Sequence, residues 1–126
     1  CQTHEHRNGL AANNIVAHCN DVGLDVNRSH AITLTHNTLV NTAGIGARGG
    51  SSAQSLANLF AGGVHTRDGS KIDSHDDHPL RNLFDADTAA SLRWNTVAKP
   101  PGVRATADDD FLGQRRPPHT TPGAIH

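Results

Sequence analysis

The segment Ala31-Ile32-Thr33-Leu34-Thr35-His36-Asn37-Thr38-Leu39-Val40-Asn41 decides the fold of this chain. Its first half alternates apolar and polar residues with a period of two, which is typical of a β-strand with one buried face. Asn37 interrupts the alternation, and a second short run follows at residues 38–40. The segment therefore predicts two short strands that are joined by a sharp turn.

The turn asparagine and the residues after it recur along the chain. The copies are 21 to 24 residues apart and begin at Asn14, Asn37, Asn58 and Asn82. Each of the first three is followed by a strand that opens with glycine: Gly23-Leu24-Asp25-Val26, Gly44-Ile45-Gly46-Ala47 and Gly63-Val64-His65-Thr66. A repeat of about 22 residues is too short for a strand, a helix and a crossover, but it fits three strands in one coil of a parallel β-solenoid.

The recurring asparagine has a physical explanation in such a fold. Coils are stacked about 4.8 Å apart, so equivalent side chains form columns. Asparagine tolerates the left-handed backbone of a sharp bend, and its amide can bond to the amides above and below it. We therefore expect a ladder of Asn14, Asn37, Asn58 and Asn82. The residue two positions after each one is apolar and should lie inside: Val16, Leu39, Phe60 and Phe84.

Two observations limit this interpretation. Asparagine is common in turns, so the four copies could also mark unrelated turns. In addition, the strand Ala53-Gln54-Ser55-Leu56 alternates in the opposite phase to Ile32 and Leu34.

The composition narrows the class of protein. The 126 residues suffice for one domain, and 11 Lys and Arg against 12 Asp and Glu give a formal net charge of -1. This balance argues against a nucleic-acid partner, and no apolar run reaches the roughly 18 residues of a membrane span. The chain begins at Cys1 and has no methionine, which we interpret as a processed chain or a fragment. Cys1 and Cys19 either pair in an oxidising compartment or remain separate thiols.

The pattern divides the chain into two parts. Residues 1–97 carry the repeats and are expected to form three to four coils. Residues 98–126 hold five of the six prolines without a clear period, which predicts an extended capping tail. The open end of a solenoid exposes strand edges and needs such a cover. An uncovered end would favour end-to-end self-association.

The repeats and the tail together resemble the right-handed parallel β-helix superfamily, which includes pectate lyases, chondroitinase-like and alginate lyases, and many exported bacterial proteins. The tail runs from Asp108-Asp109-Asp110-Phe111-Leu112-Gly113-Gln114-Arg115-Arg116-Pro117 to Pro122-Gly123-Ala124-Ile125, and is similar to the DFDG-x-x-RP … DIGA-x-E close of such proteins. Pro122 stands where the family usually has aspartate, and His126 lies near its usual final glutamate. The resemblance implies the C-terminal portion of a right-handed β-helix, all-β, in a protein that is secreted or on the cell surface.

Aligning the three glycine-led strands predicts which of their side chains face outward. One outward column holds Asp25, Gly46 and His65, and a second holds Asn27, Arg48 and Arg67. The inward columns are Leu24, Ile45 and Val64, and Val26, Ala47 and Thr66. The resemblance implies that a substrate groove runs along such a face.

These outward residues suit an acidic sugar. Arginine binds a carboxylate in bidentate fashion and acidifies the neighbouring C–H bond, while histidine takes the proton in a β-elimination. We assign Arg48 and Arg67 to carboxylate binding and His65 as the base. Asp25 tunes the site or binds calcium, and no other cofactor is assigned. The substrate-binding residues are Asp25, Asn27 and, as a sugar-stacking platform, Trp94.

Each assignment has a plainer alternative. The outward charges could be ordinary solvated residues, with Asp68 pairing Arg67, and Trp94 could pack under the tail. Two His-rich stretches, His4-Glu5-His6 and Asp73-Ser74-His75-Asp76-Asp77-His78, match no named zinc or calcium loop. The acidic run Asp108-Asp109-Asp110 could bind calcium, but a polar turn is the favoured interpretation. No metal site is assigned.

Two classes of function follow. The first is a carbohydrate-active enzyme, or its C-terminal part, that acts as a lyase or hydrolase on an acidic polysaccharide. The second is a non-catalytic β-solenoid, such as a surface adhesin or scaffold fragment, whose coils display loops. Loss of turnover in Arg48→Ala or Arg67→Ala variants with the fold intact would favour the first.

Overall fold

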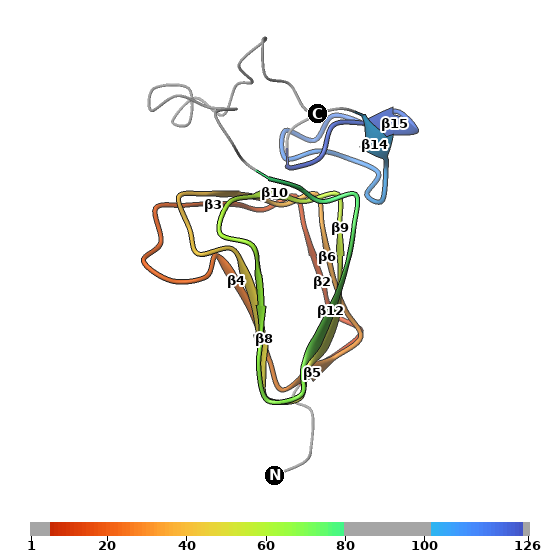
Figure 1. Cartoon of the computed structure of the whole chain (residues 1–126). Coiled ribbons are helices and arrows are strands. Elements are labelled where there is room, and N and C mark those ends of the chain that lie inside the picture. The colour runs from red at the N-terminus through yellow and green to blue at the C-terminus, as the bar shows by residue number, and fades with distance from the viewer. Residues whose placement is uncertain (1–5, 80–101, 125–126) are drawn as a thin grey trace.

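The computed structural model describes residues 6–79 and 102–124, which contain strands and no helix. Three parallel sheets form the three sides of a coil with a triangular outline (Figure 1). The first face holds β2 (Leu10–Ala12), β6 (Ile32–Thr35), β9 (Ser52–Leu56) and β12 (Lys71–His75). The second face holds β3 (Ile15–Ala17), β7 (Thr38–Val40), β10 (Leu59–Phe60) and β13 (His78–Pro79). The third face holds β4 (Leu24–Asn27), β8 (Ile45–Arg48) and β11 (Val64–Thr66).

Two small pairs complete the described structure. β1 (His6–Arg7) pairs with β5 (Ser29–His30) in parallel at the corner between the third and first faces. β14 (Val103–Arg104) pairs with β15 (His119–Thr120) in antiparallel orientation within the tail. Every pair between coils is parallel, so the described residues form a parallel β-solenoid of about four turns. The predicted all-β solenoid is confirmed.

The asparagine ladder lies at the corner between the first and second faces. Asn14 Nδ2 donates to Asn37 Oδ1 at 3.0 Å, and Asn37 Nδ2 donates to Asn58 Oδ1 at 2.9 Å. The next rung is Asp77, whose Oδ1 accepts from Asn58 Nδ2 at 3.1 Å. The ladder is therefore confirmed for three asparagines, but aspartate holds the position expected for Asn82, which lies outside the described residues.

The left-handed residue at this corner is the one before each rung. Asn13, His36, Ala57 and Asp76 have φ angles of 58°, 52°, 55° and 58°, whereas none of the ladder residues has a positive φ. The expectation that the ladder asparagine itself supplies the left-handed bend was wrong. The asparagine instead satisfies the backbone that the bend leaves unpaired, because its Oδ1 also accepts the backbone N–H of the preceding rung, as at Asn14 (3.0 Å).

The interior follows the predicted columns. Leu39 and Ile45 are fully buried and join Val26, Leu34 and Phe60 in one apolar cluster. On the third face Leu24 and Val64 flank Ile45 in the register that the alignment predicted. Val64 is 39% exposed and Thr66 is also exposed, because β11 is the last strand of that sheet among the described residues.

The strand with the opposite phase keeps its register through a polar interior residue. Ala53 pairs with Ile32 and Ser55 pairs with Leu34, so Ser55 takes an interior position and is fully buried. Its Oγ accepts from Asn58 Nδ2 at 2.9 Å, which compensates for the loss of water. A shift by one residue would put Leu56 inside but would break the ladder.

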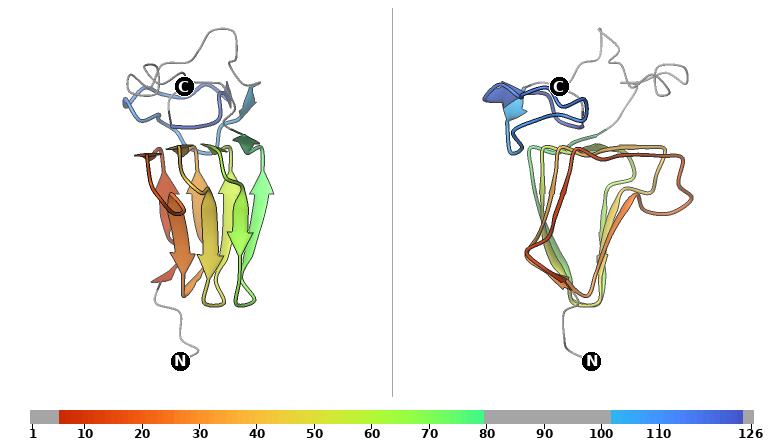
Figure 2. Two further views of the ribbon diagram at one scale, coloured as in Figure 1. Left: turned by 60° about the vertical axis from the view of Figure 1, so that its left-hand side comes forward. Right: turned by 180° about the vertical axis from the view of Figure 1, so that it is seen from behind.

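In its described part, the tail does not cover an end of the coils. Residues 102–124 lie along the side of the stack, over the second face and its corner with the first (Figure 2). Their hydrogen bonds reach Asn13, His36 and Ala57, which belong to three successive coils. The tail thus ties coils together from outside, which differs from the expected cap. The expected boundary between residues 97 and 98 falls outside the described residues.

Candidate functional site

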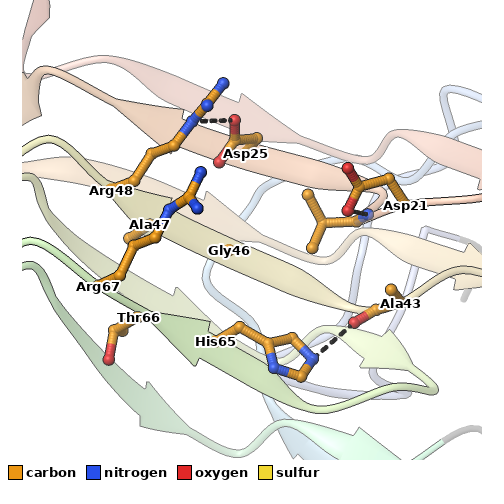
Figure 3. A pocket seen from close by; sticks show the side chains of 10 residues that line it. Asp21, Asp25, Ala43, Gly46, Ala47, Arg48, His65, Thr66 and Arg67 are labelled. Atoms are coloured by element: carbon orange, nitrogen blue, oxygen red, sulfur yellow. Dashed lines mark hydrogen bonds and ion pairs between the residues drawn. The ribbon is translucent and has the colours of Figure 1, made fainter.

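The outward residues of the third face surround one hollow of about 420 Å³. The register pairs Asp25 with Gly46 and Gly46 with His65, as the alignment predicted. Its lining combines side chains from the three strands and from two turns: Asp21, Val22, Asp25, Ala43, Gly46, Ala47, Arg48, His65, Thr66 and Arg67. Four of the predicted site residues, Asp25, Arg48, His65 and Arg67, therefore share a single site (Figure 3).

Unequal turns create this hollow. The turn into the third face spans residues 18–23 in the first coil, 41–44 in the second and 61–63 in the third. The longer first turn projects beyond the others (Figure 1) and brings Asp21 and Val22 to the rim. Gly46 forms the floor, and a Cβ there would lie 3.3 Å from Val22 and 3.5 Å from Asp25. A side chain at position 46 would fill the space.

Arg48 is held by an aspartate of the neighbouring coil. Its Nε donates to Asp25 Oδ2 at 3.0 Å, across the side of the hollow (Figure 3). Both side chains are well exposed, so the pair contributes at most about 1 kcal/mol to stability. A ligand carboxylate can therefore displace Asp25 at little cost, but it must compete with it.

Arg67 is the more open cation. Its backbone N–H continues the ladder by donating to Ala47 O at 3.0 Å, and its side chain extends beside that of Arg48 (Figure 3). Within residues 6–79 and 102–124 its guanidinium has no ion-pair partner. The alternative that Asp68 pairs with Arg67 is not what the structure has, because the Asp68 carboxylate accepts the backbone N–H of Gly49 at 3.2 Å.

His65 is held in one tautomer by backbone carbonyls. Its Nε2 lies 2.9 Å from Ala43 O and 2.7 Å from Gly62 O. Carbonyl oxygens only accept, so Nε2 carries the hydrogen in the neutral ring and Nδ1 keeps the lone pair. In this tautomer Nδ1 is the ring nitrogen that can accept a proton.

The remaining predicted residues do not join the site. Asn27 pairs with Arg48 in the register but does not line the hollow. Trp94 lies outside the described residues. Sequence reasoning missed Asp21, for which the only signal was the larger spacing before Gly23, and it placed Thr66 in the interior although Thr66 lines the rim.

Metal ligands do not gather in the part of the chain that the structure describes. No group of three or more His, Cys, Asp and Glu side chains is arranged to hold an ion there. In the stretch 73–78, Asp77 is engaged by the ladder and by the Ser74 hydroxyl. In the run 108–110, Asp110 Oδ1 accepts the backbone N–H groups of Leu112 and Gln114, both at 2.9 Å, which makes it a turn residue as expected. Cys19 is a free thiol, and Cys1 is outside the described ranges.

The fold places the chain in the class of parallel β-solenoids, and the hollow adds a site of mixed charge on one face. No protein-family model, no curated protein and no solved structure matches the chain. The resemblance to pectate lyase-like proteins therefore has no support beyond the solenoid itself. The described residues also hold no helix long and apolar enough to cross a membrane.

Proposed function

We propose that this solenoid binds an acidic polysaccharide in the hollow of the third face and cleaves it by β-elimination, as part of an exported protein. The observation that carries the proposal is that Arg67 and His65 line the same hollow. Arg67 has no ion-pair partner among the described residues, and the two carbonyl contacts of His65 Nε2 leave Nδ1 able to accept a proton. His65 lies in β11 and Arg67 directly follows this strand, and both line the same hollow of about 420 Å³.

The chemistry assigns a separate task to each group. Arg67 neutralises the uronate carboxylate, which acidifies the hydrogen on the adjacent carbon. His65 Nδ1 takes that proton, a carbon–carbon double bond forms, and the glycosidic oxygen leaves and is protonated by water. Arg48 joins Arg67 once the ligand carboxylate replaces Asp25. Asp21 and Thr66 offer further polar contacts at the rim.

The test is turnover of pectate, alginate, hyaluronan and chondroitin, with and without calcium, followed by absorbance of the unsaturated uronate. We expect Arg67→Ala to lower kcat/KM at least about 100-fold and His65→Gln to lower kcat by a similar factor. Arg48→Ala should also impair turnover. Arg104→Ala removes an exposed arginine from the tail strand β14 and serves as the matched control.

The Asp25–Arg48 ion pair favours a second candidate function, because the carboxylate of Asp25 already neutralises one of the two arginines of the hollow. This candidate is a non-catalytic solenoid that displays its surface as an adhesin or scaffold. It predicts saturable binding of an acidic polysaccharide that Arg67→Ala weakens, with no unsaturated product. Folded protein with neither binding nor turnover on all four polymers would contradict the proposed function.

A further inference from the structure

The tail covers a histidine that the proposed function does not use. His36 occupies the left-handed corner position before Asn37 and is fully buried. Its Nε2 accepts the backbone N–H of Thr106 at 3.1 Å, so one ring nitrogen holds the tail directly. Its Nδ1 is buried and makes no hydrogen bond with the described residues.

One charged group acts on this ring, and it is a cation. Arg116 of the tail is 6% exposed and donates to Asn13 Oδ1 at 2.8 Å and to the carbonyls of Gly123 and Ala124 at 2.9 Å. It is the charged group that acts on His36, while Asp110 acts on Arg116. The corner neighbours of His36 along the stack, Asn13 and Ala57, carry no charge.

Charged and titratable groups lie further along the same corner. Asp76 follows Ala57 in the column of left-handed residues, and His75 lies beside it at the end of β12. Both are exposed to solvent, which screens their charges. The tail itself carries one described histidine, His119, which is exposed on β15.

From this geometry we infer that residues 102–124 form an acid-released strap, which detaches from the coils when His36 takes up a proton. A protonated Nε2 cannot accept the Thr106 N–H, so the contact between ring and tail is lost. The imidazolium would also lie in a buried site beside the Arg116 guanidinium. Release exposes the ring to water and moves it away from Arg116. It also uncovers Thr38 on the second face, whose Oγ1 accepts the backbone N–H of Ala124 at 2.8 Å in the strapped state.

The direction of the pH dependence follows from the two states of the ring. Burial, and then Arg116, lower the pKa of His36 from 6.5 to about 4 in the strapped state, and they outweigh the backbone groups of Gly123 and Thr121, which act in the opposite direction. Well above pH 6.5 the ring is neutral in both states and the strap is fully favoured. As the pH falls from 6.5 to 4, only the released state binds the proton. The balance therefore shifts toward release by about 20-fold between pH 7 and pH 5, and it approaches about 300-fold below pH 4.

Hydrogen exchange of the full chain tests this inference, with protection corrected for the intrinsic rate at each pH. We expect protection of the tail amides bonded to the coils (Thr106, Gly123 and Ala124) to fall about 20-fold from pH 7 to pH 5. Protection of the coil amides in β7 and β8 should change much less. His36→Gln keeps an acceptor near the position of Nε2 but does not titrate, so its tail protection should not depend on pH in this range.

Two variants control for the other histidines. His18→Gln alters an exposed histidine that also occupies a left-handed corner (φ 60°), and His119→Gln alters the histidine of the tail. Both should retain the pH dependence of the parent chain. Equal loss of protection in the parent and in His36→Gln would overturn the inference. If His36→Gln does not fold, an NMR titration of the His36 ring in the parent decides, and a midpoint near 6.5 would overturn it.

Discussion

Gly44→Ala is expected to lower the free energy of unfolding by about 4 kcal/mol, a large fraction of the stability of a domain of this size. A Cβ on Gly44 would lie 2.0 Å from the backbone oxygen of Gly63 and 2.9 Å from its nitrogen. The same oxygen accepts the N–H of Ile45 at 3.0 Å, so it cannot move away without loss of a bond between coils. The φ of +93° at Gly44 adds a further strain to any L side chain.

Gly63→Ala is the matched control. It also has a positive φ, +76°, but a Cβ there would meet no atom within 4 Å. This variant should lose only about 1 kcal/mol, which is the strain of the backbone conformation alone. Urea unfolding followed by far-UV circular dichroism measures both. If both variants lost the same free energy of unfolding, the close approach of the Gly63 backbone would not explain the need for glycine at position 44.

The sequence predicts those parts of the fold in which the same type of residue recurs at the equivalent position of successive coils. The column of Leu24, Ile45 and Val64 could be predicted because each of these residues follows a glycine and begins an alternating strand. In the second coil the structure explains the glycine, because the backbone of Gly63 lies against Gly44 and leaves no room for a Cβ.

The predicted ladder is confirmed for Asn14, Asn37 and Asn58. The next rung is Asp77, whose carboxylate accepts hydrogen bonds from the backbone N–H and the side chain of Asn58. An aspartate suffices there because the last described rung has no further rung to which it must donate. The recurrence of asparagine alone does not predict this rung.

The position of the tail and the ion pair of the site could not be predicted from the sequence repeats. The tail binds through single contacts between residues far apart in the chain, such as Asn13 Nδ2 to Asp109 O at 2.6 Å, and these leave no periodic signal. The Arg48–Asp25 pair joins two outward columns diagonally. It depends on Gly46, which is level with Asp25 and has no side chain to separate the two.

Asn37→Asp is the second change from which we expect a large effect, a loss of about 4 kcal/mol at pH 7. Asn37 is fully buried, and its Nδ2 donates to Ala11 O and Asn58 Oδ1, both at 2.9 Å. Aspartate would place an oxygen opposite these two acceptors and bury a negative charge there. Urea unfolding gives the loss, and Asn27→Asp, the same change at an exposed strand position, should alter stability by less than about 0.5 kcal/mol.

The pH dependence of this loss separates repulsion in the ladder from a simple loss of packing. Burial raises the pKa of an aspartate at position 37, so the folded variant binds a proton more readily than the unfolded chain. The penalty is then complete above that raised pKa and shrinks as the pH falls toward about 4, where the carboxyl group regains one donor. Comparison with the parent at each pH cancels the titration of His36. A penalty that stays constant from pH 7 to pH 4 would mean that the amide hydrogens of Asn37 do not hold the coils together.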